Sequence, residues 1–364
     1  MSEPKRVLIG GFTENVGGLE TYVMNIYRNI DRNKLQFDFL KMSSTMAFED
    51  EIEGMDGKVL YVPGRSKGIR AHYDALKKIF SSTHYAALCY QCNRRLDSLD
   101  TFRYAKKYGV NKRIIHSHNT KDAPETTVRR IKQWMVSGRI DKYLTHRFAC
   151  SHDAGKWMFG DHQFTVIPNS VDTELFKYNA QIREKKRNEL GIADNTFVIG
   201  NVARLSEQKN PMLMLDVFEA VHEQHPDSIL LQIGNGEMKE QFFEAVKDKH
   251  LEESVRILGI RSDVNELLSA MDVFLLPSNY EGFPIVLVEA QCNGLPCIVS
   301  DVITRDCNLT GLVKYLSLSQ ETDAWADEVL KATVDNRTNY YKKIEQAGYS
   351  NKAVAARMEK FFTE

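Results

Sequence analysis

Apolar and polar residues alternate along the chain in a way that predicts short buried strands separated by amphipathic helices. Residues 7–9 form an apolar run that leads through glycines into apolar positions at helical spacing from residue 22 to residue 30. Further runs of strand length occupy residues 37–40, 58–62, 86–90 and 113–118, with a helical pattern at 72–80. Short apolar strands that alternate with helices are typical of a parallel sheet covered on both faces.

The same pattern begins again in the second half of the chain. Residues 165–169 end the first series, and the polar stretch 177–192 fits a linker followed by an entry helix. New apolar runs follow at residues 197–202, 229–234, 255–259, 273–277 and 296–300. A chain of 364 residues is too long for one ordinary core and fits two domains of roughly 150–200 residues. The sequence therefore predicts an α/β protein with two domains that meet near residue 175.

Charge is distributed unevenly along the chain. The net charge is −1, which gives no argument for a nucleic-acid partner. The stretch 103–147 nevertheless carries twelve Lys and Arg against three acids, or +9, so the rest of the chain carries −10. A basic stretch in an otherwise acidic protein suggests one surface that faces an anionic partner.

The N-terminus and the cysteines bear on the compartment. The apolar run at 7–9 is shorter than a signal peptide needs, and no stretch approaches the roughly 18 apolar residues of a membrane span. We expect a cytoplasmic protein with its six cysteines reduced. Cys89 and Cys92 have the spacing of half a zinc site, but no second pair has ligand spacing, so no metal is predicted.

Glycines and cations follow the first strand of each half. Gly17 and Gly18 stand at a strand-to-helix junction, where the backbone can approach an anion, although a simple turn explains them equally well. Arg204 and Lys209 follow the strand at 197–202, where they can converge on a diphosphate unless the loop is merely solvated. Residues 234–238 resemble a dinucleotide-binding turn but lack its third glycine, which makes a dehydrogenase a weak interpretation.

A further motif covers residues 278–290, after the strand at 273–277. Pro284 suits the first turn of a helix, which would leave the amides of Phe283 and Ile285 open to a phosphate or a sugar hydroxyl. Glu281 precedes this helix, and Glu289 lies within it among apolar residues. An idle charge is costly in such a place, so a carboxylate that accepts hydroxyl hydrogens is the better interpretation.

These motifs together resemble the family-4 retaining glycosyltransferases of the GT-B fold. The order and spacing of Gly17-Gly18, residues 167–172, Arg204 with Lys209, and Glu281 with Glu289 fit that family over nearly the whole chain, although position 170 is Ser where the family often has Gly. Segments 17–40 and 149–159 look most like bacterial capsule and exopolysaccharide enzymes. The resemblance implies two facing Rossmann-like domains with a cleft between them. Residues 1–175 would form the acceptor side and residues 176–347 the donor side, with a helix at about 348–364 that crosses back.

The resemblance also implies roles for single residues. Arg204 and Lys209 would hold the donor diphosphate, Glu289 the ribose and Glu281 hydroxyls of the donor sugar. His118 matches the family histidine near that sugar, and the neighbouring His116 leaves this alignment open. The predicted catalytic residues are Glu281, His118, Arg204 and Lys209. The predicted donor-binding residues are Gly17, Gly18, Asn169, Gly236, Arg261, Gly282, Phe283, Pro284, Ile285 and Glu289.

A basic segment at residues 128–136 points to a membrane. Its apolar positions have helical spacing and lie beside cations, which suits a helix on an anionic bilayer as well as a helix with a solvated basic face. With the resemblance, this predicts peripheral contact with the inner face of the cytoplasmic membrane and a lipid-linked or other saccharide acceptor.

The resemblance implies a retaining enzyme of polysaccharide biosynthesis that takes its sugar from a nucleotide-diphosphate sugar. UDP is the expected nucleotide by family frequency, and the departing diphosphate is expected to help take the acceptor proton. No metal or other cofactor is expected, since Arg204 and Lys209 can neutralise the leaving group and no Asp-x-Asp motif is present. The alternatives are a sugar-nucleotide epimerase, which needs no acceptor, and a non-catalytic subunit that scaffolds a partner transferase.

Overall fold

The computed structural model describes residues 3–119 and 126–364, which form two compact units. Unit 1 contains residues 1–170 and 351–364, and unit 2 contains residues 171–350. The sequence placed the boundary at 175/176 and began the returning helix at about 348. None of the helices among the described residues is both long and apolar enough to cross a membrane.

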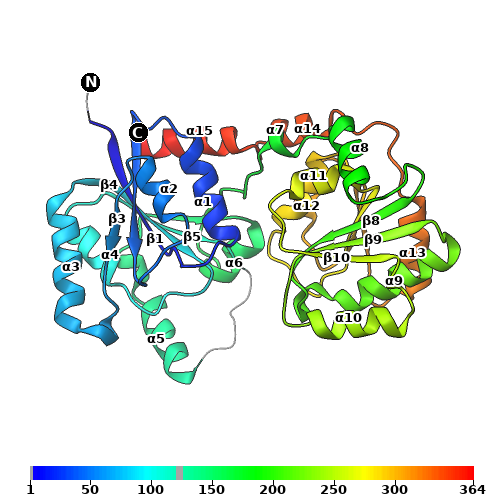
Figure 1. Ribbon diagram of the computed structural model, residues 1–364. Coiled ribbons are helices and arrows are strands. Elements are labelled where there is room, and N and C mark those ends of the chain that lie inside the picture. The colour runs from blue at the N-terminus through cyan, green and yellow to red at the C-terminus, as the bar shows by residue number, and fades with distance from the viewer. Residues whose placement is uncertain (1–2, 120–125) are drawn as a thin grey trace. The chain divides into compact units, whose positions relative to one another are not determined.

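Unit 1 is built on a seven-stranded sheet of order β3-β2-β1-β4-β5-β6-β7, in which every neighbouring pair is parallel. Its helices lie on both faces of the sheet (Figure 1). The strands are β1 Lys5–Gly10, β2 Leu35–Lys41, β3 Val59–Tyr61, β4 Tyr85–Cys92, β5 Lys112–Ser117, β6 His146–Ala149 and β7 Thr165–Val166. The helices are α1 Gly18–Asn29, α2 Glu49–Gly54, α3 Ile69–Ser82, α4 Asp100–Lys107, α5 Thr127–Ser137, α6 His152–Phe159 and α15 Asn351–Thr363.

The C-terminal helix α15 completes the core of unit 1. Its Phe362 ring meets the Phe37 ring of β2 edge-on, with centroids 6.0 Å apart. Val354 and Met358 are buried in the same apolar cluster as the inner side chains of α1. At the helix end, Glu359 accepts a hydrogen bond of 2.8 Å from the backbone amide of Asp31. The last residues of the chain therefore belong to the N-terminal fold, because their apolar stripe is part of its core.

Unit 2 repeats the design with six parallel strands in the order β10-β9-β8-β11-β12-β13. The strands are β8 Phe197–Val202, β9 Ser228–Ile233, β10 Val255–Gly259, β11 Val273–Leu276, β12 Cys297–Ser300 and β13 Val313–Leu316. The helices are α7 Thr173–Phe176, α8 Ala180–Glu189, α9 Pro211–Gln224, α10 Lys239–Asp248, α11 Val264–Ala270, α12 Ile285–Cys292, α13 Thr322–Lys331 and α14 Tyr340–Gln346. Helices α9 and α10 lie on one face of the sheet, and α11 and α12 lie on the other (Figure 1).

Two strands escaped the sequence analysis, namely β6 and β13. Each has only four residues and mixes polar with apolar side chains: His-Arg-Phe-Ala in β6 and Val-Lys-Tyr-Leu in β13. Both lie outside the central strands, where one or two outward residues remain in contact with water. Apolar runs reveal strands that are buried on both faces, so strands such as these give no such run.

An arginine cluster ties helix α8 to unit 2. Asp272 accepts hydrogen bonds from Arg183 at 2.6 Å, from Arg187 at 2.7 Å and from the backbone amide of Val198 at 2.8 Å. Arg183 and Arg187 also donate to the carbonyl of Ala270, where α11 ends. Cations suit a helix C-terminus, whose last carbonyls lack partners within the helix. The polar stretch that the sequence identified as an entry helix is therefore anchored by charge.

We predict that Asp272→Ala destabilises the protein by about 3 kcal/mol, because it leaves the guanidinium of Arg187, which is 1% exposed, without its counter-ion. Denaturant unfolding of the full chain measures this change. Glu252→Ala, at an exposed site, is the control and should stay within about 0.5 kcal/mol of the parent. A loss below about 1 kcal/mol for Asp272→Ala would show that the cluster is not an anchor.

Candidate functional site

The candidate donor site of unit 2 lies where the order of strands reverses. The chain passes from β8 outward to β9 and β10, and then returns to the other side of β8 as β11. Ligands of open α/β sheets bind beyond the carboxyl ends of the strands at such a point. Arg204 and Lys209 follow β8, and the segment 278–285 follows β11. The two motifs that the sequence singled out are thus neighbours in space.

Lys209 and Glu281 meet at this point. The Lys209 ammonium forms an ion pair with Oε1 of Glu281, and the Glu281 side chain is only 6% exposed. Ser278 donates a hydrogen bond of 2.8 Å to the same oxygen. The sequence analysis did not identify Ser278, although its place directly after β11 at the start of the motif is a usable signal. The result is a fixed carboxylate whose other oxygen, Oε2, has no hydrogen bond or ion pair among the described residues.

Backbone contacts hold the loops around this pair together. The amide of Asn279 donates to the carbonyl of Gln208 at 2.8 Å, and the Gln208 side chain donates to the carbonyl of Tyr280 at 3.1 Å. Gly236 presses against the loop after β8, because a Cβ there would lie 2.2 Å from the carbonyl oxygen of Leu205. Gly236, in the turn at residues 234–238, therefore allows the loop after β9 to pack against the loop after β8. This packing explains the glycine without a bound dinucleotide.

Arg204 and Arg261, the other two cations predicted for the site, lie in different surroundings from Lys209. Arg204 is 74% exposed and has a single ion pair of 3.1 Å with the exposed Glu237, so its guanidinium can turn toward a ligand. Arg261 follows β10, and its Nε and Nη2 donate hydrogen bonds to the carboxylate of Asp263 at 2.8 and 2.7 Å. No described contact links Arg261 to Lys209 or Glu281. The structure thus does not bring Arg261 to the pair at the strand reversal.

The segment before α12 ends in an open helix start. Pro284 is the N-cap residue, one position earlier than the first helical turn that the sequence predicted, and its side chain caps no amide. The Phe283 ring stacks on Tyr349 at 5.7 Å, which fixes the backbone on the N-terminal side. The amides that follow Pro284 are therefore donors at the positive end of a helix dipole. Gly282 and Ile285 flank the two fixed residues.

Glu289 is a carboxyl group without a counter-ion. It lies one turn from the end of α12, between Val288 and Ala290, which are fully buried. Burial raises the pKa of Glu289 from 4.5 to about 7. No described side chain forms an ion pair or a hydrogen bond with it. Such a group is destabilising unless a ligand hydroxyl or amine pairs with it, and perturbed carboxyls of this kind cluster at functional sites.

In unit 1, the predicted glycines form the turn into α1. Gly17 is the N-cap of α1 with extended backbone and no capping side chain. The buried Glu20 accepts hydrogen bonds from the amide and the hydroxyl of Thr13, at 3.1 and 2.7 Å. A Cβ at Gly17 would lie 2.9 Å from Oε2 of Glu20, so a larger residue there would displace the end of this side chain. These contacts support a defined loop at the carboxyl end of β1.

The two candidate histidines of unit 1, His116 and His118, differ in exposure. His116 is in β5 and wholly buried, and neither ring nitrogen has a hydrogen-bond partner among the described residues. His118 lies past the strand end and remains partly exposed. Its Nε2 contacts Oε1 of Gln91 at 2.8 Å, a residue at the end of β4 that the sequence analysis missed. Burial lowers the pKa of His118 to about 3, so its ring is neutral at physiological pH.

Asn169 lies beside His118, at the end of unit 1. Its Oδ1 is buried without a hydrogen-bond partner in the described part of the chain. A neutral imidazole and an unpaired amide oxygen are groups that a polar ligand can satisfy.

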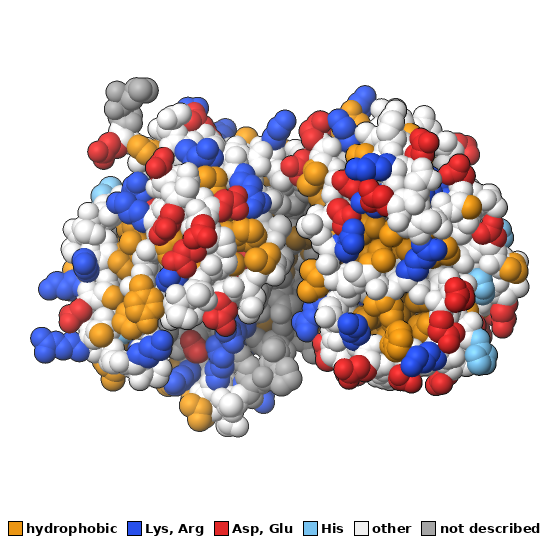
Figure 2. Space-filling view, viewed as in Figure 1, with side chains coloured by type: hydrophobic (Ala, Val, Ile, Leu, Met, Phe, Trp, Pro, Cys, Tyr) orange, Lys and Arg blue, Asp and Glu red, His pale blue; other side chains and the backbone are white. Residues whose placement is uncertain are grey.

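The predicted basic segment is helix α5. Its apolar residues do not pack into unit 1: the exposed residues are Val128, Ile131, Trp134 and Met135. Lys and Arg side chains gather around the same end of this unit (Figure 2). The helix therefore exposes an apolar stripe beside its cations to solvent. This arrangement fits contact with a membrane, which stays a prediction.

The two cysteines with zinc-like spacing lie in β4 and are buried. Three residues apart in a strand, their side chains point to opposite faces of the sheet. Within residues 3–119 and 126–364, no three His, Cys, Asp or Glu side chains gather as a metal site would require.

We predict that Glu289→Gln stabilises the protein without nucleotide at pH 8 by up to about 3 kcal/mol and leaves it unchanged near pH 4. The folded carboxyl keeps its proton up to about pH 7, whereas the unfolded carboxyl loses it above its usual 4.5. Stability therefore falls as pH rises from about 4.5 to 7 and is level above, and glutamine removes this loss. Denaturant unfolding at both pH values is the measurement. A variant that is less stable than the parent at pH 8 would contradict an unpaired carboxyl group in apolar surroundings.

Comparisons with known proteins agree with this geometry. The family model described as "Glycosyl transferases group 1" matches residues 182–351, most of unit 2. Over 362 residues the chain is 35% identical to EpsF of Bacillus subtilis (strain 168), which is named as a glycosyltransferase, and the match covers 96% of this chain and 94% of EpsF.

A second relative is the UDP-Gal:alpha-D-GlcNAc-diphosphoundecaprenol alpha-1,3-galactosyltransferase of Escherichia coli. It is 30% identical over 243 residues, which cover 63% of this chain and 61% of that enzyme. Among solved structures, the Anabaena protein Alr3699/HepE in complex with UDP has a TM-score of 0.78 at 18% identity, over 99% of each chain. This likeness confirms the predicted pair of Rossmann-like domains of the GT-B fold. The similarity to EpsF over nearly its whole length shows that the chain belongs to the group 1 glycosyltransferases.

Proposed function

We propose that this glycosyltransferase moves a sugar from a UDP-sugar to a lipid-linked saccharide during polysaccharide assembly, with retention of configuration. The observation that carries the proposal is the Lys209–Glu281 ion pair at the strand reversal of unit 2, followed in the chain by helix α12 with the unpaired carboxyl of Glu289. Two named proteins support the substrates: the E. coli relative acts on UDP-Gal and a diphosphoundecaprenol-linked sugar, and HepE was solved with UDP and with UDP-glucose.

Each charged group has a part in holding the donor. Glu289 accepts the ribose hydroxyls, which replace the missing partners of its carboxylate. Arg204 and Lys209 face the diphosphate, and the amides at the start of α12 add hydrogen bonds to it. Glu281, fixed by Ser278 and Lys209, accepts hydroxyls of the donor sugar with its second oxygen.

The transfer exchanges one bond for another at the anomeric carbon. The bond from this carbon to the diphosphate oxygen breaks, the bond to the acceptor oxygen forms on the same face, and the acceptor proton passes to the departing diphosphate. Arg204 and Lys209 stabilise the charge that develops on the diphosphate, so the proposed reaction needs no metal. His118, with a pKa of about 3, is too weak a base to take a proton at neutral pH. Its part is to orient the sugar as a neutral hydrogen-bonding group.

We expect UDP, measured in the presence of EDTA, to raise the melting temperature of the protein, because a ligand of the native state stabilises it by mass action. Glu289→Ala should lose most of this shift, and Glu240→Ala, at an exposed position of unit 2, should keep it. A panel of UDP, GDP and ADP with their common sugars identifies the base. No shift with any nucleotide would refute the transferase proposal and favour a scaffold subunit, and a product formed from the nucleotide sugar alone would favour an epimerase.

Peripheral membrane binding through α5 is the second part of the proposal. Trp134 is 75% exposed, and an exposed tryptophan beside cations suits the boundary of an anionic bilayer. We expect the protein to co-sediment with vesicles that contain an anionic lipid, and Trp134→Ala to reduce the bound fraction several-fold. Phe243→Ala changes an exposed aromatic residue of unit 2 and should have no effect. Equal partitioning to neutral and anionic vesicles would rule the contact out.

A further inference from the structure

His118 contacts a glutamine side chain that has partners at both ends of its amide. Oε1 of Gln91 lies 2.8 Å from Nε2 of His118, and the amide nitrogen of Gln91 donates 3.3 Å to Sγ of Cys89. Gln91 lies near the end of β4 and is 5% exposed, so these two contacts hold its amide in one orientation. Because an amide oxygen only accepts hydrogen bonds, Nε2 of His118 carries the hydrogen of the ring.

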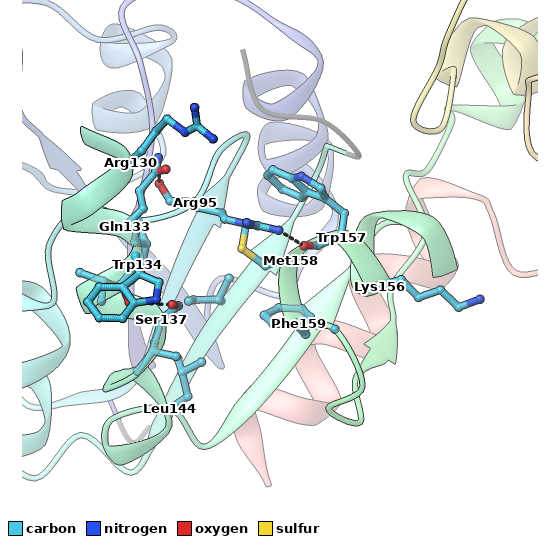
Figure 3. Close-up of a pocket in the computed structure, with 15 residues that line it drawn as sticks. Arg95, Arg130, Gln133, Trp134, Ser137, Leu144, Lys156, Trp157, Met158 and Phe159 are labelled. Carbon is cyan, nitrogen blue, oxygen red and sulfur yellow. Dashed lines mark hydrogen bonds between the residues drawn. The ribbon is translucent and has the colours of Figure 1, made fainter. Parts of the chain in front are cut away.

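The loop that follows β4 is braced on its neighbours, which fixes the end of the strand. Asn119 donates 3.1 Å to the carbonyl of Asn93 at the start of this loop. Figure 3 shows Arg95, further along the loop, which donates 2.8 Å to the carbonyl of Trp157 in α6. Gln133 of α5 donates 3.2 Å to the carbonyl of Arg95. The glutamine that contacts the histidine is therefore presented from a strand end that is held on two sides.

The surroundings of the ring keep it neutral. Burial lowers the pKa of His118 to about 3. The rings of Tyr22 and His116 lie nearest, with centroids 5.0 and 4.2 Å from that of His118. Both are uncharged at neutral pH, because burial raises the pKa of Tyr22 and lowers the pKa of His116. A neutral imidazole has a single N–H, and Gln91 takes it, so Nδ1 of His118 is left with a lone pair.

A second acceptor lies beside this ring. Burial dominates the pKa of His118, and Asn169 opposes it by favouring the charged ring, as an oxygen acceptor that faces the ring does. Asn169 is 7% exposed, and its Oδ1 is buried without a hydrogen-bond partner in the described part of the chain. The neutral ring cannot donate to this oxygen, since its one N–H is directed at Gln91. Two lone pairs therefore lack hydrogens, and a ligand can supply them.

We propose that Gln91 fixes the tautomer of His118, so that Nδ1 of His118 and Oδ1 of Asn169 accept hydrogens from hydroxyl groups of the donor sugar. Gln91 is a positioning residue that acts through His118. The pair of acceptors also selects a class of sugar: an uncharged hexose offers hydroxyl hydrogens, whereas the carboxylate of a uronic acid offers only lone pairs. The inference rests on the proposed function and adds the hydrogen-bond polarity of its sugar site.

The nitrogen chemical shifts of the imidazole test the tautomer directly. In the isotope-labelled full chain at neutral pH, proton–nitrogen correlation spectra should show Nε2 of His118 protonated and Nδ1 unprotonated, with His118→Phe assigning the signals. Gln91→Leu removes the acceptor and should give a mixture of both tautomers. Gln163→Leu makes the same change at an exposed site and should keep the single form. Protonated Nδ1 in the parent, or an unchanged tautomer in Gln91→Leu, would overturn the proposal.

Nucleotide sugars test the polarity of the site. In titrations with EDTA present, we expect UDP-glucose or UDP-galactose to bind the parent at least about threefold more tightly than UDP-glucuronate. Gln91→Glu places a carboxylate against Nε2, which favours the charged ring and puts a hydrogen on Nδ1. This variant should lose or reverse the preference, and Gln163→Glu should keep it. A parent that binds UDP-glucuronate as tightly as both hexose donors, or a preference unchanged in Gln91→Glu, would contradict the acceptor pair.

UDP without a sugar separates this failure from failure of the proposed function. In that function UDP is held by unit 2, so its shift of the melting temperature should be the same in the parent, Gln91→Leu and Gln91→Glu. A retained shift also shows that the variants are folded. A normal UDP shift with the wrong tautomer refutes the role of Gln91 alone, whereas a parent without any UDP shift refutes the donor assignment.

Discussion

All strands of both sheets run parallel, and the remaining features of the molecule depend on this constraint. Parallel strands send every returning connection across a face of the sheet, so every carboxyl end, and every loop that follows it, lies at one edge. In unit 1 the order reverses between β1 and β4, and in unit 2 between β8 and β11. At each reversal the two loops diverge to opposite faces, which leaves the backbone amides and polar side chains of both loops open to a ligand.

The candidate site of unit 2 has unfavourable electrostatics in the absence of a ligand. Glu289 sits among apolar residues of α12 with a pKa near 7 and no counter-ion among the described residues, while the charge of Glu281 is balanced by Lys209 and the same oxygen accepts a hydrogen bond from Ser278. The surrounding structure is fixed elsewhere, by the arginine cluster around Asp272 on the α8 side. In unit 2 the carboxylate of Asp272 is thus paired with arginines, whereas Glu289 at the candidate site has no partner among the described residues. A polar ligand can supply that partner.

Unit 1 shows a comparable division between neutral and charged groups. His118 is kept neutral by burial and oriented by Gln91, beside an Asn169 oxygen that lacks a partner. Elsewhere in the same unit, helix α5 carries the exposed cations Arg130 and Lys132 beside an exposed apolar stripe. Neutral groups suit sugar hydroxyls, and cations suit phosphates. The lipid-linked saccharide that we propose as the acceptor carries both kinds of group, which is why we assign it to unit 1.

The sequence by itself determined the fold class, the two series of strands and the motifs at the strand ends, because fully buried strands need uninterrupted apolar runs and loops that approach a ligand need glycine. It did not reveal β6 and β13, whose four residues mix polar and apolar side chains. It also left His116 and His118 unresolved, since both are histidines of one segment. The end of β5 separates them by burial: His116 is still inside the sheet, and His118 lies just past it. Only tertiary structure brought Ser278 and Lys209 to Glu281, assigned Arg261 to Asp263, and left the apolar stripe of α5 uncovered. These facts depend on which segments become neighbours across the sheet edge, and a local pattern of residues holds no information about its distant neighbours.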